Sequence, residues 1–475
     1  MAYLKSTLLS QSEQDLIHDQ SVECLQEVGI QVDSESVLEL LEKEGASVDY
    51  ENYRAKLPAK MVDRAIESAP KEFTLCGRDP EHDLELPTRS YPYATTNGLC
   101  PFINDFETGE YRYATRADIA RFTKFGDAID SVDFLWTSLS ATDVPPHVDP
   151  LHTLWATLQN TTKHVQCVTV QSAEAARIQI ELAALAAGGR EELKKRPILS
   201  TVVCPISPLF FERQAIESQV EFARAGVPIV SLAMPSGGMS APVTIAGMML
   251  TANAENLASL VITQAAAPGA PHLFRTESTP MNMVDGSFNY DAPEFGLIFS
   301  GMGQMTRRYR LPSFTGDFAA FRVDGDKRDT MFASFIMYCA SSSHTDIVAG
   351  LGAIDDSKGV CYKQLLVDAY TWECCRKYLE PVDVTEEKLG LDALRDIGPR
   401  GNFLTHAHTR KYLRRELIQL DPGKREFLEL KKEEQSEKSG ELVTEILEKH
   451  RVTPLDQSIL KKGDDIIEAY EQKSA

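Results

Sequence analysis

Aromatic side chains gather around the ends of the runs that the sequence predicts to be strands. Aromatic faces attract cations, and an ammonium ion held against one gains about 0.5–2 kcal/mol. Core packing is the more frequent role for any single ring. The sequence therefore leaves both a cation-binding box and an ordinary core open for these residues: Tyr91, Tyr93, Phe102, Trp136, Phe314, Phe318 and Phe321.

Two glycine-rich connections follow predicted strands. They are MPSGGMSAPVT (234–244) and AGLG (349–352). Glycine lets a backbone approach a flat ligand closely, but neither stretch matches a GxGxxG fingerprint or a phosphate-binding P-loop. These glycines are candidates for cofactor contact, with a tight connection as the alternative reading: Gly237, Gly238, Gly350 and Gly352.

The sequence carries no strong motif for metal or triad chemistry. HExxH and GxSxG do not occur. The ten histidines are few for this length; an HxH pair occurs at His406 and His408, and His344 stands near a strand. Metal sites need several converging ligands, so structural histidines are favoured and no tightly bound metal is expected. The nine cysteines contain no CxxC pair, which is typical of reduced thiols rather than of a disulfide framework.

Eight short β-prone runs alternate with long helical patterns between residues 91 and 380. This alternation predicts a parallel sheet, and eight units favour a TIM-type (β/α)8 barrel over an open doubly wound sheet. The predicted strands are residues 91–95, 134–141, 165–170, 198–204, 228–234, 272–277, 312–316 and 346–352. The predicted helices are residues 116–130, 150–162, 172–187, 212–225, 242–266, 292–309, 327–341 and 359–379.

Two further regions flank the predicted barrel domain of residues 91–380. Residues 1–90 combine amphipathic helical stretches with short β-prone runs, which predicts an N-terminal helical and short-strand decoration. Residues 381–475 are strongly charged, with opposite charges at helical spacing. We expect a C-terminal helical extension there, as an exposed and solvated tail.

Composition bounds the class of protein. The chain has 475 residues, 43% of them hydrophobic, and a formal net charge of −21. This is a globular composition, and its acidity argues against nucleic-acid binding. Neither a signal peptide nor an apolar run of about 18 residues is evident, so we expect a cytoplasmic protein without a membrane partner.

Several stretches in collinear order resemble the trimethylamine methyltransferase family, in its large branch without pyrrolysine. The longest of them, residues 234–271, is the most specific. The resemblance rests on FINDFETGEYRYATRADIARFTKFGDAID (102–130), CPISPLFF (204–211), MPSGGMSAPVTIAGMMLTANAENLASLVITQAAAPGAP (234–271), PMNMVDG (280–286), APEFGLIFSGMGQMTRRYRLP (292–312) and GNFLTHAHTRKYLRREL (401–417). Two positions depart from the family pattern: Asn282, and the segment TGDFAAFRVDGDKRD (315–329).

The resemblance implies a TIM barrel that transfers a methyl group from a methylated amine to cob(I)alamin on a small partner corrinoid protein. It also implies a homo-oligomer. The chain contains only standard residues, and pyrrolysine-free relatives are similar in sequence but use quaternary amines. Glycine betaine is therefore the first expected substrate, with carnitine, proline betaine and gamma-butyrobetaine as alternatives.

A quaternary ammonium leaves as a neutral amine, so its departure needs no proton and the protein has mainly to bind and orient. We expect the cation to lie in a cage of Tyr93, Phe102, Trp136 and Phe318, positioned by Glu277 or Asp317. Arg275 or His344 would bind a substrate carboxylate, and Gly237, Gly238, Gly350 and Gly352 would let the corrinoid approach. A metal-dependent barrel enzyme and a non-catalytic small-ligand-binding protein stay open as alternatives.

Overall fold

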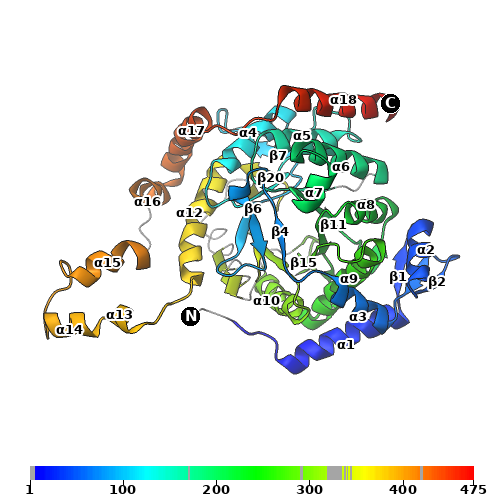
Figure 1. The fold of residues 1–475 in the computed structure, drawn as a ribbon, viewed down its shortest axis with the longest axis horizontal. Helices are drawn as coiled ribbons and strands as arrows, with labels where there is room; N and C mark the ends of the chain where they lie inside the picture. Colours follow the sequence, from blue (N-terminus) through cyan, green and yellow to red (C-terminus); the bar gives the residue numbers. More distant parts are fainter. Residues whose placement is uncertain are drawn as a thin grey trace.

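Eight parallel strands form the centre of the molecule, and helices surround them (Figure 1). The computed structural model describes residues 6–168, 172–288, 292–317, 334–335, 338–339, 341–342, 345–417 and 421–474. Neighbouring strands follow the order β6-β18-β17-β15-β13-β11-β10-β9. Their bounds are β6 (Tyr93–Thr96), β9 (Leu135–Trp136), β10 (Val165–Val168), β11 (Leu199–Val203), β13 (Ile229–Ala233), β15 (His272–Thr276), β17 (Ser313–Asp317) and β18 (Ile347–Leu351).

Hydrogen bonds join the first and last strands of this sheet, β6 and β9. Thr95 and Phe134 form a parallel bridge, and the Thr95 hydroxyl donates to the Phe134 carbonyl at 2.8 Å. The backbone N–H of Trp136 in turn donates to the Thr95 hydroxyl at 3.1 Å. The eight predicted strands and the TIM-type barrel are therefore confirmed, and the carboxyl ends of all eight strands surround one mouth.

Local capping residues determine where the barrel helices begin and end. Thr115 caps α4 in a capping box with Asp118, and α6 ends at Gly188, whose φ of 91° is left-handed. The outer ring comprises α4 (Arg116–Asp127), α5 (Asp149–Gln159), α6 (Ala173–Ala187), α7 (Arg190–Lys195), α8 (Arg213–Arg224), α9 (Ile245–Ala266), α10 (Pro293–Arg308) and α12 (Tyr362–Leu379). The predicted helix 327–341 lies largely outside the described residues.

Helix α9 is unusually apolar because it is covered on both sides. The barrel lies on one side, and α1 (Gln11–Glu27) and α3 (Ala59–Ser68) pack on the other. Among the described residues, α9 is long and apolar enough to cross a membrane, but 78% of its most apolar window is buried inside the protein. Burial of this kind is what a core helix of a folded domain shows.

The N-terminal segment adds two small sheets. One sheet pairs β12 (Phe210–Phe211), β1 (Ile30–Val32), β3 (Arg54–Lys56) and β2 (Ser47–Asp49), beside α2 (Glu35–Lys43). The other pairs β4 (Phe73–Leu75) with β5 (Leu84–Leu86), separated by a 3-10 turn at Pro80–His82. Leu75, Leu84 and Leu86 pack with barrel residues such as Phe134 and Leu273. This hairpin therefore closes the amino end of the barrel.

Further short strands follow the carboxyl ends of the barrel strands. A sheet of β19 (Ala353–Ile354), β20 (Gly359–Cys361), β7 (Phe102–Asn104) and β8 (Tyr111–Tyr113) follows β6 and β18. A two-stranded pair, β14 (Ser236–Gly237) and β16 (Thr279–Pro280), extends β13 and β15. These additions shape the mouth.

The C-terminal extension is helical, as predicted, but much of it is packed. It comprises α13 (Glu386–Leu389), α14 (Leu391–Ile397), α15 (Ala407–Glu416), α16 (Pro422–Glu429), α17 (Lys432–Lys449) and α18 (Gln457–Ser474). Helix α17 packs on α4 and α12, and α18 packs on α5 and α6, with Val443 and Ile467 buried. The prediction of an exposed tail is wrong for these two helices, because their sparse apolar residues fall on one face.

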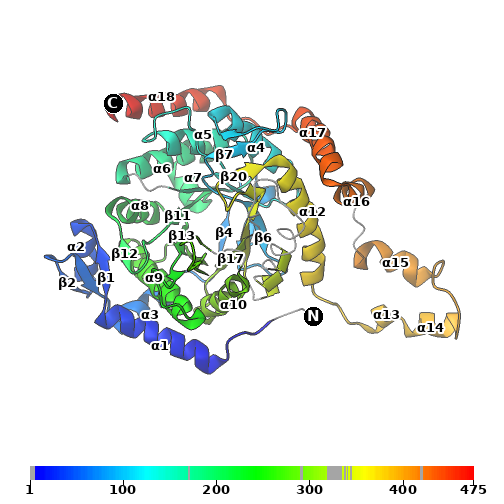
Figure 2. The same ribbon diagram turned by 180° about the vertical axis from the view of Figure 1, so that it is seen from behind.

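Figure 2 shows the same helices from behind, with α16–α18 against the barrel and α13–α15 standing away from it. The indole N–H of Trp155 donates to Asp464 at 2.9 Å, which fastens α18 to the barrel wall. The division into domains 1–90, 91–380 and 381–475 stays a prediction, because these contacts do not show which parts fold independently.

Candidate functional site

The barrel interior holds a buried cation near its mouth. Arg275 lies in β15 and is 1% exposed. Its Cζ is 4.0 Å from the ring centroid of Phe314 in β17 and 4.6 Å from that of Trp136 in β9. Strands β9 and β17 are not neighbours, so these two rings meet across the barrel interior. The aromatic faces hold a cation, as the sequence suggested, but that cation belongs to the protein.

Two carboxylates face the Arg275 guanidinium. Its Nε donates to Glu277 Oε1 at 3.0 Å, and its Nη2 also donates to this oxygen. Asp317 Oδ2 lies 3.4 Å from Nη2. Both carboxylates lie beside the Arg275 cation in a site that water scarcely reaches. A carboxylate in such a site attracts a cationic ligand more strongly than an exposed carboxylate would.

Four buried polar atoms around this cluster have no hydrogen-bond partner among the described residues. They are Arg275 Nη1, Trp136 Nε1, and the Nε2 and Oε1 of Gln166. Gln166 pairs directly with Trp136 on the neighbouring parallel strand, so both side chains point into the barrel. A buried polar group without a partner costs about 1–3 kcal/mol. Several in one place indicate a site that a polar ligand completes.

Helix α9 secures the strand and loop that border this site. Asn256 donates its side-chain N–H to the Arg275 carbonyl at 3.1 Å. The neighbouring Glu255 accepts from the Ser207 hydroxyl at 2.8 Å and from the Leu209 N–H at 2.9 Å. Burial raises the pKa of Glu255 to about 7. The loop after β11 is therefore held by a carboxyl group that titrates near neutral pH.

The glycines at the end of β18 have a backbone role. Gly350 and Gly352 have φ values of 90° and 81°, and the pairing of β18 with β6 shifts register between Val348 and Leu351. The Gly352 N–H donates to Asp368 at 2.8 Å, and burial raises the pKa of Asp368 to about 7. Bulge geometry thus accounts for both glycines, and their contact with a cofactor stays a prediction.

The loops after β13 and β15 form an apolar rim on one side of the mouth. A Cβ on Gly237 would lie 2.5 Å from Met248 Sδ, so this glycine is required by packing. Gly238 has a φ of 92°, and Met283 lies over it. Residues 225–254 carry no charged side chain. The exposed side chains of the rim are Met239, Val243, Met283 and Val284.

Two cysteines near the mouth are unsuited to act as nucleophiles. Cys100 follows β6, and Cys204 follows β11. Burial raises the pKa of each thiol to about 12. The thiolate is the reactive form of cysteine, so both side chains stay protonated and inert at neutral pH.

The predicted four-ring cage is not assembled as the sequence suggested. Tyr93 begins β6 and pairs with Ile347, the first residue of β18, so it lies at the amino end of the barrel rather than at the mouth. Phe102 lies in β7, stacked between Tyr111 and Tyr113 at centroid distances of 5.0 and 4.6 Å. Among the described residues, no ring contact joins Tyr93 or Phe102 to Trp136.

The remaining predicted residues divide into two groups. Trp136, Arg275, Glu277 and Asp317 come together as described above. Phe318 and His344 lie outside the described residues. Gln166 was missed. Its sequence signal is a long polar side chain within the mostly apolar run VQCVTV, which is otherwise interrupted only by Thr169.

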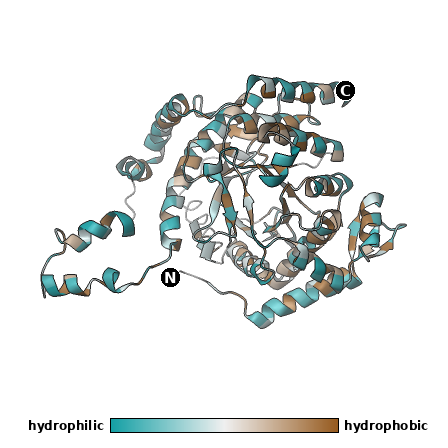
Figure 3. Cartoon of the chain, viewed as in Figure 1, coloured by the Kyte–Doolittle hydropathy of each residue, from teal (hydrophilic) through white to brown (hydrophobic). Residues whose placement is uncertain are grey.

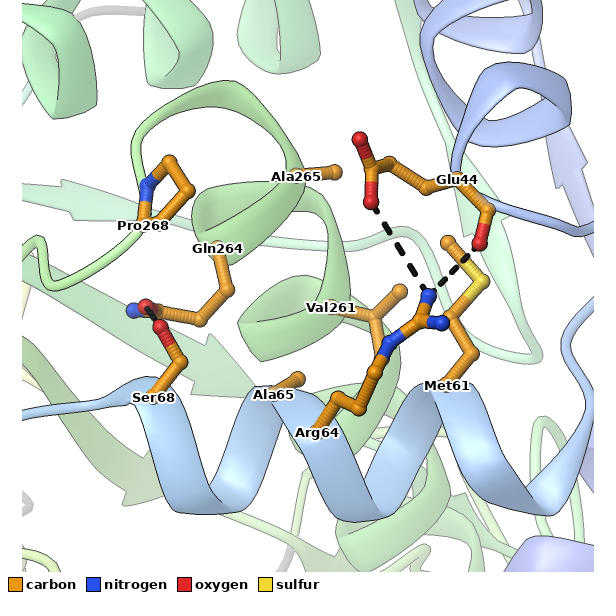
Figure 4. Close-up of a pocket in the computed structure, with 9 residues that line it drawn as sticks. All are labelled: Glu44, Met61, Arg64, Ala65, Ser68, Val261, Gln264, Ala265 and Pro268. Carbon is orange, nitrogen blue, oxygen red and sulfur yellow. Dashed lines mark hydrogen bonds and ion pairs between the residues drawn. The ribbon is translucent and has the colours of Figure 1, made fainter.

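A surface pocket lies elsewhere, between α3 and the carboxyl end of α9 (Figure 4). Arg64 donates to the Glu44 carbonyl at 2.6 Å, and Ser68 donates to Gln264 at 2.9 Å. A barrel helix runs antiparallel to its strands, so the end of α9 lies beside the amino end of the barrel. Active sites in this fold form at the opposite end, and this pocket is not a candidate.

No group of three or more His, Cys, Asp or Glu residues in the described part of the chain is arranged to hold a metal ion. The sequence-based expectation that no metal is tightly bound stays a prediction.

Comparison with known proteins assigns the family. The family model described as "Trimethylamine methyltransferase (MTTB)" matches residues 2–473. The chain belongs to the trimethylamine methyltransferase family. Trimethylamine methyltransferase MttB of Desulfitobacterium hafniense (strain DSM 10664 / DCB-2) is 30% identical over 470 residues, covering 98% of this chain and 94% of that protein.

A second relative of the trimethylamine methyltransferase family carries a different substrate in its name. The glycine betaine methyltransferase of Desulfitobacterium hafniense (strain Y51) is 27% identical over 414 residues, covering 87% of this chain and 85% of that protein. These relatives confirm the predicted family and establish the chain as a methyltransferase.

The fold agrees with that of a solved structure. The crystal structure of the Methanosarcina barkeri monomethylamine methyltransferase (MtmB) matches with a TM-score of 0.53 at 14% identity. The match covers 94% of this chain and 96% of that chain. At this identity it supports the barrel architecture, and the substrate has to be argued from this chain's own site.

Proposed function

We propose that this methyltransferase removes a methyl group from a quaternary amine that also carries a carboxylate, with glycine betaine as the first candidate. The acceptor in this proposal is the cob(I)alamin of a separate small corrinoid protein, and dimethylglycine is released. The observation that carries the proposal is the buried Arg275, which has a free Nη1 donor beside two carboxylates and an aromatic face.

The cluster offers one position for each charge of a betaine. The substrate carboxylate would accept from Arg275 Nη1, with Trp136 Nε1 and the Gln166 amide as further donors. Charge-assisted hydrogen bonds of this kind are the strong ones. The Glu277 carboxylate, with Asp317 beside it, would attract the quaternary nitrogen, and the Trp136 ring would add a cation–π contact.

The chemistry asks little of the protein beyond binding and alignment. The carbon–nitrogen bond of the donor breaks, the nitrogen keeps the electron pair, and a neutral tertiary amine leaves without a proton. When its carrier protein is docked, cob(I)alamin supplies the nucleophile. This chain's residues then hold the methyl carbon in line with the mouth and exclude water, which is where most of the rate advantage arises.

Features of the mouth fit an acceptor that arrives from outside. The nearby thiols of Cys100 and Cys204 are held protonated, so neither offers a competing nucleophile. The exposed rim of Met239, Val243, Met283 and Val284 is apolar and lies next to the site. An apolar rim suits contact with a flat macrocycle and the protein that carries it.

Carnitine, proline betaine and gamma-butyrobetaine carry the same two charges, so they are alternative substrates of the same site. Trimethylamine, the substrate named for the 30% identical relative, has no carboxylate and would leave Arg275 Nη1 unpaired. This comparison favours a carboxylated substrate. We place the reaction in the cytoplasm, in keeping with the composition of the chain.

The test is turnover with free cob(I)alamin and one amine at a time. Glycine betaine, carnitine, proline betaine, choline and trimethylamine are compared by following the loss of the cob(I) absorbance band and the appearance of methylcobalamin. Methylation with a carboxylated quaternary amine, and little with choline or trimethylamine, is the expected result. Equal or faster turnover with choline or trimethylamine would contradict the carboxylate assignment, and no methylcobalamin with any amine would contradict the function.

A further inference from the structure

The loop that follows β6 lies directly on the indole of Trp136. Gly98 makes the contact: a Cβ added to it would lie 2.2 Å from Cε2, 2.4 Å from Nε1 and 2.6 Å from Cδ2 of the ring. Non-bonded carbon atoms pack at about 3.5–4.0 Å. The three ring atoms are adjacent, so the added carbon would lie over the face of the indole. Only a residue without a side chain can occupy position 98 while the ring keeps its place.

The contact with the ring, rather than the backbone conformation, requires a glycine at this position. The φ of Gly98 lies outside the left-handed region, whereas that of Gly352, at the end of β18, is 81°. Alanine at position 98 would therefore meet no left-handed backbone strain. The change Gly98→Ala adds one methyl group and tests the contact with the ring alone.

Hydrogen bonds on both sides of Gly98 hold the loop against the segment that carries Trp136. Before Gly98, the Thr96 hydroxyl donates to the Trp136 carbonyl at 3.0 Å. After it, the Leu99 N–H donates to the Thr137 carbonyl at 2.8 Å. The loop is thus fixed to the backbone of the residue whose ring it covers.

The same loop is also fastened to the connection between β19 and β20. The Asn97 side-chain N–H donates to the Ser357 carbonyl at 3.3 Å, and the Cys100 thiol donates to the same carbonyl at 3.2 Å. The loop therefore has little freedom to move away from the ring. A methyl group added to Gly98 has to be accommodated by a shift of the Trp136 indole.

We infer that Gly98 is a positioning residue for the amine site, which sets where Trp136 presents its ring and its indole N–H. This inference rests on the proposed function. Trp136 Nε1 is a buried donor without a hydrogen-bond partner among the described residues, and Arg275 Cζ lies 4.6 Å from the ring centroid. Both features depend on the exact place of the ring, and a site binds best when its groups are held in position beforehand.

The effect of Gly98 on the reaction passes through the Trp136 ring. Gly98 has no side-chain group that could take part in methyl transfer. The ring is proposed to bind the substrate before the methyl group moves, and the loss of such a contact raises KM more than it lowers kcat.

The experiment is a double-mutant cycle of Gly98→Ala and Trp136→Ala, with glycine betaine as donor and free cob(I)alamin as acceptor. Gly98→Ala alone should raise KM about tenfold, as loss of the ring would, and should change kcat less than about twofold. In the Trp136→Ala background, Gly98→Ala should change KM less than about twofold, because the ring atoms that the methyl group meets are gone.

Gly440→Ala is the matched control. Gly440 lies in α17, outside the ring of barrel strands, where Figure 3 shows both hydrophilic and hydrophobic positions. A Cβ on Gly440 would lie 3.8 Å from the Phe106 carbonyl oxygen, which is an ordinary contact. The same change of glycine to alanine should therefore leave KM at its wild-type value.

Two further measurements need no methyl donor. The near-ultraviolet circular dichroism of Trp136, taken as the difference between the wild type and Trp136→Ala, should change in Gly98→Ala. Gly98→Ala should also lower the melting temperature of the wild type, but not that of Trp136→Ala. If Gly98→Ala alone fails to fold, the double variant should fold as well as Trp136→Ala does, because the clash is removed.

An unchanged KM and an unchanged near-ultraviolet spectrum in a folded Gly98→Ala protein would overturn the inference. An equal effect of Gly98→Ala with and without the Trp136 ring would do the same. If no amine is turned over while the spectrum and the melting temperatures change as expected, the contact of Gly98 with the ring stands and the proposed function fails.

Discussion

Replacing Arg275 by Lys tests directly whether Arg275 Nη1 binds the substrate carboxylate. Lysine keeps a positive charge beside Glu277 and Asp317, but it lacks the free Nη1 donor. One charge-assisted hydrogen bond to a substrate carboxylate is worth about 1.5–3 kcal/mol. We therefore expect kcat/KM for glycine betaine to fall about 10- to 150-fold, whereas turnover of choline should not fall.

Stability separates this effect from a general loss of structure. Arg275→Lys gives up the guanidinium contacts with Trp136 and Phe314, which should lower the free energy of unfolding by about 1–2 kcal/mol. Arg275→Met removes the buried cation from beside Glu277 and Asp317 and should cost about 3–5 kcal/mol. Denaturant unfolding of both variants gives the comparison.

The assay follows methylcobalamin formation from glycine betaine and from choline with the wild type and Arg275→Lys. An unchanged kcat/KM for glycine betaine in a folded Arg275→Lys protein would refute the assignment of Nη1 to the carboxylate. A parallel loss for both amines would show that the side chain only supports the barrel.

Three further perturbations test other parts of the site. Gln166→Leu removes two unpartnered buried atoms, so thermal unfolding should show equal or higher stability while KM for the betaine rises; lower stability with unchanged KM would make Gln166 structural. Trp136→Ala should raise KM for the substrate about tenfold and destabilise the protein by about 3–5 kcal/mol, and an unchanged KM would remove the ring from the site. The pKa of Glu255 is raised from 4.5 to about 7 in the folded protein, so its ionisation should lower wild-type stability by about 3 kcal/mol as pH rises from 4.5 through 7. Glu255→Gln should remove this loss in denaturant titrations across that range, and a pH dependence equal to that of the wild type would show that Glu255 does not titrate there.

The barrel could be predicted from the sequence because each strand and each helix has a recognisable local sequence pattern. VQCVTV and PIVSLAM are short, β-branched and bounded by turn residues, whereas 242–266 is a long apolar helix pattern. All eight predicted strands are present in the barrel sheet. The burial of α17 and α18 was not predicted, because their charged residues dominate the composition and only a few apolar positions, such as Val443 and Ile467, make the contact.

The site was predicted in part. Arg275 and Glu277 are polar residues at the end of the run HLFRTE, and the fold places strand ends at the mouth. The prediction that Tyr93 lies in the cage failed because this residue begins its strand. The two ends of a strand lie at opposite ends of the barrel, and the mouth is at the carboxyl end. The prediction that Phe102 lies in the cage failed because its segment folds back into the sheet of β7, β8, β19 and β20 rather than continuing from the barrel.

The sequence by itself determined the order of the elements, the eight-fold alternation and the family, because hydrophobic period and local motifs are written along the chain. Only the tertiary structure decided that the Arg275 guanidinium lies between Trp136 and Phe314, residues that are far apart in the sequence. Closure of the sheet brings non-neighbouring strands face to face across the interior, and no local pattern encodes which side chains meet there. The same holds for α13–α15, whose exposed apolar side chains, such as Leu404, are explained by the position of these helices away from the barrel.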